Sequence, residues 1–173
     1  MITIVSSTHR PDSNSKKIAQ FYQKELKALG ADSQILDLQD LPQNFMFSNM
    51  FGEKDNGFKA VQTLVSETQK FVFVIPEYNG SFPGILKSFI DACEFPASFK
   101  GKKAALVGLS TGRYGNIRGV GHFTGICHYI GMEVLPNKIY FPKVQLELTD
   151  NGSLKNEDTL KFTREQIAQI AEY

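Results

Sequence analysis

Residues 71–87 read FVFVIPEYNGSFPGILK, and this stretch decides the fold that we predict. Residues 71–75 are all apolar, which is typical of a short strand buried on both faces in a parallel sheet. Pro76 has no backbone N–H to donate, so we expect the strand to end there. The stretch therefore begins with a buried strand that leads into a polar loop.

A helix is predicted after that loop. Asn79 and Gly80 favour a tight turn, and Ser81 is the residue that we expect to cap the helix. The helix is predicted to run to about Cys93, with these apolar residues on one face: Ile85, Leu86, Phe89 and Ile90. Such a loop lies at the carboxyl end of a sheet, where open α/β folds bind ligands.

The same loop resembles a known family signature. Pro76-Glu77-Tyr78-Asn79-Gly80-Ser81, followed by Pro83-Gly84 and Leu86-Lys87, resembles the signature loop of the NADPH-dependent FMN reductase family. The resemblance implies a flavodoxin-like fold and relatives among quinone, chromate and azo-dye reductases. It also implies FMN as the cofactor, with NADPH or NADH as the co-substrate. The alternative interpretation is an ordinary strand-to-helix loop rich in turn residues.

Strands and helices alternate along the chain. Strands are predicted at residues 2–6, 33–38, 71–75, 103–109 and 133–141, the last in two short pieces around Pro136 and Asn137. Helices follow the successive strands, and the final one is predicted at 158–172. This alternation predicts one domain over residues 1–173, an α/β three-layer sandwich with a five-stranded parallel sheet covered by helices on both faces. The natural strand order for five such units is the flavodoxin-like 2-1-3-4-5.

Some side chains are assigned to the core by their spacing. Ile18, Tyr22, Leu26 and Leu29 are expected on the buried face of the first helix, which Gly30 ends. Residues 39–56 and 142–153 are predicted to be irregular. The first of these segments carries more apolar side chains than one layer can bury: Leu41, Phe45, Met46, Phe47, Met50 and Phe51. An exposed apolar patch of this kind predicts a subunit interface. Family members also pair through this region, so we expect a homodimer or a tetramer.

Composition limits the classes of function. The chain has 173 residues, 42% of them hydrophobic, and a net charge of +1, so we expect no nucleic-acid or membrane partner. No basic segment and apolar core precede the strand at 2–5, so we expect a cytoplasmic protein. Cys93 and Cys127 lack metal or redox spacing, and we expect two small buried side chains. His9, His122 and His128 suggest no metal triad, so no metal is expected; the last two are predicted to be half-buried.

The loop before the first helix is a candidate anion site. Thr8, Ser13 and Ser15 offer hydroxyls, Asn14 offers an amide, and Arg10 can hold a phosphate through two hydrogen bonds. An N-cap cluster beside a solvated arginine is the alternative. The resemblance favours a phosphate loop for FMN at residues 8–13, although Ser7 stands where the family commonly has glycine.

The loop at 76–80 is predicted to hold the flavin ring. The resemblance assigns Pro76, Glu77, Tyr78, Asn79 and Gly80 to the cofactor site. Backbone N–H groups of residues 78–80 and the Asn79 amide can stabilise charge at the pyrimidine edge of the ring. Glu77 is expected to bind backbone donors or a neighbouring subunit, and Tyr78 to stack beside the ring or to lie in a subunit contact. No catalytic side chain is expected, because flavin N5 carries the chemistry.

The loop after the strand at 103–109 is predicted to close over the other edge of the ring. Ser110 and Thr111 can bond to the ribityl chain or the ring, and Gly112 permits a close approach. Arg113 either faces the nicotinamide nucleotide or is solvated. The glycines at 119, 121 and 125 are spaced wrongly for a dinucleotide fingerprint, and we expect them to serve helix packing.

The function expected from these features is that of a flavoenzyme. We expect NAD(P)H to pass a hydride to flavin N5, and a quinone, an azo compound or free flavin to accept the electrons at the same open face. A flavodoxin-like electron carrier is disfavoured by the charge of +1, since such carriers tend to be strongly acidic. A cofactor-free scaffold on the same fold remains an alternative.

Overall fold

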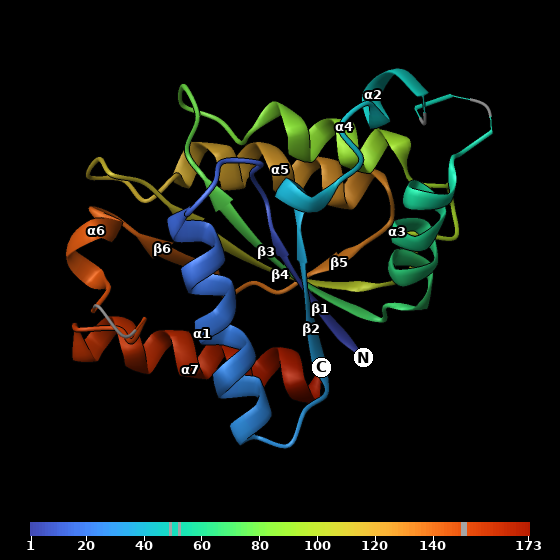
Figure 1. Cartoon of the computed structure of the whole chain (residues 1–173). Helices are drawn as coiled ribbons and strands as arrows, with labels where there is room; N and C mark the ends of the chain where they lie inside the picture. Colours follow the sequence, from blue (N-terminus) through green and yellow to red (C-terminus); the bar gives the residue numbers. More distant parts are fainter. Residues whose placement is uncertain (49, 52, 150–151) are drawn as a thin grey trace.

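The computed structural model describes residues 1–48, 50–51, 53–149 and 152–173 as a parallel sheet between two layers of helices (Figure 1). The six-stranded sheet has the order β2-β1-β3-β4-β5, and β6 pairs with β4 beside β5. The strands are β1 (Ile2–Ser6), β2 (Ser33–Asp37), β3 (Lys70–Pro76), β4 (Lys103–Leu109), β5 (Glu133–Val134) and β6 (Ile139–Phe141). All strand pairs are parallel, so the predicted flavodoxin-like order is confirmed.

The longer helices cover the two faces of this sheet. Figure 1 shows α1 and α7 on one face and α3, α4 and α5 on the other. Their bounds are α1 (Asn14–Ala28), α3 (Asn56–Glu67), α4 (Gly84–Ala92), α5 (Ile117–Tyr129) and α7 (Glu157–Glu172). Three short helical segments lie in the connections: η1 (Leu38–Asp40), α2 (Phe45–Ser48) and α6 (Val144–Glu147).

The position of β3 between two helix layers explains why its residues 71–75 are all apolar instead of alternating between apolar and polar. Its side chains point alternately into the two helix layers: Phe71, Phe73 and Ile75 belong to the core under α3, α4 and α5. Val72 and Val74 belong to the core under α1 and α7. Since both faces of a parallel sheet are covered, each successive side chain is buried.

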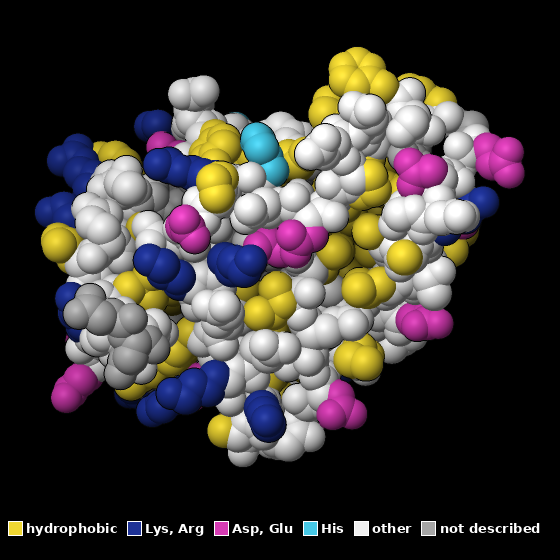
Figure 2. All heavy atoms as spheres, in the orientation of Figure 1, with side chains coloured by type: hydrophobic (Ala, Val, Ile, Leu, Met, Phe, Trp, Pro, Cys, Tyr) yellow, Lys and Arg dark blue, Asp and Glu magenta, His cyan; other side chains and the backbone are white. Residues whose placement is uncertain are grey.

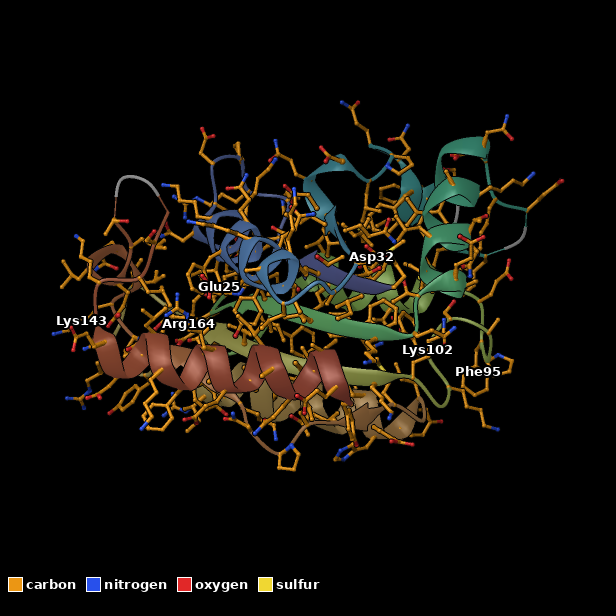
Figure 3. All side chains as sticks on the ribbon, turned by 90° about the horizontal axis from the view of Figure 1, so that it is seen from below. Glu25, Asp32, Phe95, Lys102, Lys143 and Arg164 are labelled. Carbon is orange, nitrogen blue, oxygen red and sulfur yellow. The ribbon has the colours of Figure 1, made fainter. Side chains whose placement is uncertain are left out.

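Polar contacts join α7 to α1. Arg164 Nε lies 2.7 Å from Glu25 Oε2, and Figure 3 shows the two side chains facing each other. Beneath them, the buried Tyr22 hydroxyl donates to Gln166 Oε1 at 2.7 Å. Gln166 Nε2 in turn donates to the carbonyl oxygens of Leu106 and Asn137. This network fixes α7 against β4 and the start of β6.

Two predicted helix boundaries are wrong. Ser81 does not cap α4, because it pairs with Tyr78 in a turn and Pro83 is the N-cap residue. The loop after β4 was expected to extend over residues 110–121, but helix α5 already begins at Ile117, because Asn116 caps it. By contrast, the last strand does form in two pieces, as predicted, and both pair with β4.

Several burial predictions also differ from the structure. Leu29 is 57% exposed, because it lies at the C-terminal cap of α1 and not on its buried face. His122 and His128 are exposed and not half-buried. The two cysteines are buried free thiols, as predicted. The irregular segments contain the short helices α2 and α6, and the predictions for residues 49, 52 and 150–151 within them lie outside the described residues.

Membrane-spanning helices and metal-binding clusters are both absent from the described residues. None of their helices combines the length and apolar character that a membrane span requires. The same residues contain no group of three or more His, Cys, Asp or Glu side chains that could hold a metal ion.

Candidate functional site

The loops after β1, β3 and β4 meet at the carboxyl edge of the sheet and line a pocket of about 380 Å³. This volume lies within the roughly 300–1,000 Å³ that is typical of small-molecule sites. The lining residues are Arg10, Pro11, Asp12, Ser13, Asn14, Ser15, Pro76, Glu77, Tyr78, Leu109, Ser110, Thr111 and Val144. The structure thus brings most of the predicted site residues together. Thr8, Asn79, Gly80 and Gly112 are outside this lining.

The first turn of α1 forms one wall of the pocket. Ser13 caps the helix by accepting a hydrogen bond from the Lys16 N–H at 3.2 Å. Ser15 is only 1% exposed, and its hydroxyl has no hydrogen-bond partner within the described chain. The first turn carries no acidic residue. An unpaired hydroxyl and free N–H groups at a helix N-terminus favour an anion, which would satisfy them.

Lys16 and Arg10, two cations near the start of α1, have different surroundings. Lys16 Nζ lies 3.0 Å from Asp37 Oδ2 at the end of β2. The Asp37 carboxylate raises the pKa of Lys16. Arg10 lines the pocket instead. Its guanidinium is therefore the cation that the first loop offers to an anion.

The loop after β3 is a tight hairpin turn. The N–H of Tyr78 donates to Ser81 O at 2.9 Å, and the N–H of Ser81 donates back to Tyr78 O at 3.1 Å. Asn79 and Gly80 between them both have positive φ, 52° and 76°, as in a type I′ turn. One of the three backbone donors expected at the ring edge, that of Tyr78, is therefore engaged within the turn. The N–H groups of Asn79 and Gly80 make no hydrogen bond to the described residues.

The side chain of Tyr78 reaches across to the first loop. Its phenolic oxygen hydrogen-bonds Thr8 Oγ1, and Thr8 Oγ1 also accepts a hydrogen bond from the Arg10 N–H at 3.2 Å. Thr8 is buried and is not among the residues that line the pocket. Thr8 therefore links Tyr78 to the backbone of Arg10.

The loop after β4 is closed by its own hydrogen bonds. Ser110 Oγ donates to Gly112 O at 3.1 Å and accepts from the Gly115 N–H at 3.0 Å. The Ser110 hydroxyl, predicted to bond to the cofactor, is thus engaged within its loop. Thr111 is exposed and lines the pocket.

Asn116 holds this loop to the end of β3. It is fully buried, with Nδ2 donating to Ile75 O at 3.0 Å and Oδ1 accepting from the Gly119 N–H at 3.1 Å. We did not predict this role, although an asparagine directly before a helix is a typical N-cap signal. An added Cβ at Gly119 would lie 2.6 Å from the Ser81 backbone, so packing explains this glycine. It does not explain Gly121 or Gly125, where a Cβ would meet no atom within 4 Å.

The fold defines a flavodoxin-like α/β protein, and its pocket lies at the topological switch point, with the start of α1 as one wall. The sequence profile described as NADPH-dependent FMN reductase matches residues 1–145, and the chain belongs to that family. It is therefore an oxidoreductase that uses FMN as cofactor and NAD(P)H as co-substrate, as the resemblance implied.

Individual relatives agree with this family. The chain is 28% identical over 170 residues to a 2-hydroxy-1,4-benzoquinone reductase from a Burkholderia species, covering 93% of this chain and 88% of the relative. It is 24% identical over 176 residues to an FMN-dependent NADPH-azoreductase from Staphylococcus saprophyticus, covering 98% and 93% of the two chains. The solved structure of FerB, a flavoenzyme NAD(P)H:(acceptor) oxidoreductase from Paracoccus denitrificans, is similar in fold, with a TM-score of 0.81 at 22% identity, covering 99% of this chain and 94% of that one.

Proposed function

We propose that FMN binds in the pocket with its phosphate at the start of α1. Arg10, Ser13, Asn14 and Ser15 would surround the phosphate. The observation that carries this assignment is the buried Ser15 hydroxyl, which has no partner within the described chain and lies in the lining of the pocket. A phosphate oxygen would accept the hydrogen bond that this hydroxyl lacks.

The ring would lie between the two remaining loops. Pro76, Glu77 and Tyr78 of the pocket lining would lie along one edge, with the adjoining turn at Asn79 and Gly80, and Ser110 and Thr111 along the other. The free N–H groups of Asn79 and Gly80 can donate to a ring edge that gains negative charge on reduction. When bound, FMN supplies two-electron transfer between a reduced nicotinamide and an acceptor. The protein residues bind and orient the ring, and none of them is assigned as a proton donor.

We propose a small quinone as the acceptor. Support comes from the benzoquinone reductase relative, which aligns over 93% of the chain. The test has two parts: flavin released by heat from the purified protein is identified, and NADPH oxidation by the FMN-loaded protein is followed with 1,4-benzoquinone. We expect FMN and quinone-dependent oxidation. Release of no flavin would contradict the site, and flavin without quinone turnover would contradict the acceptor.

We propose that the chain forms a homodimer, or a tetramer built from it. The described part of the segment at 39–56 buries Leu41 and Phe45 but leaves Phe47 93% and Phe51 90% exposed. Figure 2 shows hydrophobic side chains projecting above α2. Apolar side chains so exposed favour an interface. Light scattering of the FMN-loaded protein at micromolar concentration should give at least twice the chain mass. A monomer would contradict the proposal, and Phe47→Ser should shift the assembly toward monomer.

We place the protein in the cytoplasm. Cys93 and Cys127 are both unpaired and buried, as is usual for proteins of a reducing compartment. Fractionation of the source cells should recover the chain with cytoplasmic markers, and recovery with another compartment would contradict this location.

A further inference from the structure

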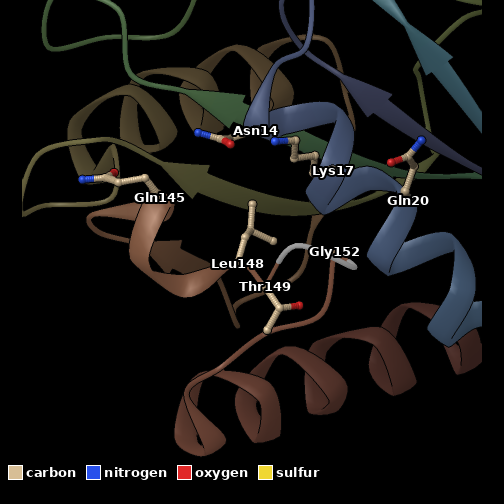
Figure 4. Close-up of a pocket in the computed structure, with 7 residues that line it drawn as sticks. All are labelled: Asn14, Lys17, Gln20, Gln145, Leu148, Thr149 and Gly152. Carbon is tan, nitrogen blue, oxygen red and sulfur yellow. The ribbon is translucent and has the colours of Figure 1, made fainter.

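A second cavity lies directly beside the flavin pocket. Its volume is about 570 Å³, and it lies between α1 on one side and Gln145 of α6, Leu148, Thr149 and Gly152 on the other (Figure 4). The lining residues are Asn14, Lys17, Gln20, Gln145, Leu148, Thr149 and Gly152. We call this cavity the α1–α6 groove.

The groove and the flavin pocket share a wall. Asn14 lines both of them. On the opposite side, Val144 lines the flavin pocket and the next residue, Gln145, lines the groove. Gln145 Nε2 also lies 3.5 Å from the carbonyl oxygen of Thr111, which is part of the flavin pocket. The groove and the flavin pocket are therefore neighbours on the two sides of Asn14.

The side chains of the groove suit a phosphorylated heteroaromatic group. Lys17 supplies a cation one turn after the proposed phosphate site, and no carboxylate is among the described lining residues. Amides of Gln20 and Gln145 can both donate and accept hydrogen bonds, as a purine edge requires. The buried Leu148 offers an apolar surface for a flat ring.

We propose that the α1–α6 groove binds an adenosine phosphate group that extends from the flavin site. This group can come from two sources: the adenylate half of FAD, bound in place of FMN, or the adenosine end of NAD(P)H. The proposal rests on the FMN site described above, because the groove adjoins that site at Asn14. Lys17 would pair with the additional phosphate, and the amides would bind the adenosine.

Binding measurements test both sources. The apoprotein is titrated with FMN and with FAD, and the FMN-loaded protein is titrated with ADP-ribose, which carries the adenosine end of the nucleotide without nicotinamide. Each titration is repeated with Lys17→Glu. Lys24→Glu is the matched control, since it makes the same charge change on an exposed face of α1 about 10 Å further along the helix.

If FAD supplies the group, FAD binds at least as tightly as FMN, and Lys17→Glu weakens FAD about tenfold more than it weakens FMN, the effect of one charged hydrogen bond. If the nicotinamide nucleotide supplies it, FAD binds more weakly than FMN, and Lys17→Glu weakens ADP-ribose by a similar factor. In either case Lys24→Glu leaves the affinities within about twofold of the parent, because exposed charges this far apart are largely screened.

Other results overturn one of the two assignments. Tight FMN binding with FAD and ADP-ribose affinities that do not respond to Lys17→Glu overturns the adenosine site and leaves the flavin site in place. An apoprotein that binds neither FMN nor FAD overturns the flavin site itself.

Discussion

The phenolic oxygen of Tyr78 lies 2.6 Å from Thr8 Oγ1, although 70 residues separate the two side chains in sequence. The bond joins the loop after β3 to the loop after β1 across the point where the strand order reverses. Because Thr8 Oγ1 also holds the backbone of Arg10, the proposed ring loop and the proposed phosphate loop are coupled.

Removing the Tyr78 hydroxyl should therefore weaken FMN binding. We expect Tyr78→Phe to cost about 0.5–1.5 kcal/mol of FMN affinity, the usual net value of one hydrogen bond. A fluorescence titration of the apoprotein measures it. Tyr114→Phe is the control, since it makes the same change in the loop after β4, where the exposed Tyr114 hydroxyl accepts a hydrogen bond from Arg113. Equal affinities in both variants would show that the Thr8 contact does not position the site.

Arg10 should contribute through the phosphate alone. We expect Arg10→Ala to weaken FMN binding by roughly 1.5–3 kcal/mol, the range for a hydrogen bond to a charged group. Riboflavin has no phosphate, so its affinity should stay the same in this variant. Arg118→Ala removes an exposed arginine from α5 and serves as the control. An Arg10→Ala variant that holds FMN as tightly as the parent would disprove the phosphate assignment.

Gly80 is expected to tolerate no β-branched side chain. Its φ is +76°, although a Cβ there would meet no atom within 4 Å, so the cost of substitution is conformational. We expect Gly80→Val to lose FMN content and to slow the reduction of bound flavin by NADPH in stopped flow, with a strain of about 1–2 kcal/mol or more. Asn79→Ala should be milder, because the backbone donors remain.

Gly30 provides the matched control for that experiment. Its φ is +75° and its surroundings are equally open, but it lies at the far end of α1. Gly30→Val should lower the free energy of unfolding to a similar extent and leave flavin reduction unchanged. Normal FMN content and normal reduction in Gly80→Val would mean that the loop does not hold the ring.

The two thiols should be inert in the native protein. Burial raises the pKa of Cys93 and of Cys127 to about 12. Since the thiolate is the reactive form, iodoacetamide at pH 8 should modify neither residue until denaturant is added, as mass spectrometry would show.

The same burial makes stability depend on pH. In the unfolded chain a thiol ionises near a pKa of about 8.5. Raising the pH above that value therefore favours unfolding, and stability should fall between about pH 8.5 and 12. Rapid modification of the native protein would contradict the burial of the thiols.

Local sequence rules were sufficient for the strands of the sheet. Strands β3 and β4 are buried on both faces, so each is a continuous apolar run, and their loops could be placed at the carboxyl edge. The same rules failed for Ser81. It is a good N-cap residue in isolation, but it is engaged in the turn with Tyr78, and its hydroxyl lies 3.0 Å from His122 Nδ1. Competition from tertiary partners decided that boundary.

Most of the predicted site residues line one pocket, but Thr8, Asn79, Gly80 and Gly112 do not, and the hydrogen bonds within the pocket wall were not predicted. Arg10, Ser15 and Thr111 line the pocket as expected. The pairing of Ser110 with its own loop and of Tyr78 with Thr8 depends on distances between segments that are remote in sequence. No periodicity or spacing in one sequence reports such distances.

The amide of Asn116 has a consequence for how a ligand is received. Because it bonds both the end of β3 and the start of α5, the loop after β3 and the loop after β4 are already joined in the folded chain. The conformational entropy of ordering them is lost during folding, so association with the flavin does not have to supply it again. Cofactor capture should then resemble docking to a rigid surface, with a backbone that moves little between the empty and the loaded protein.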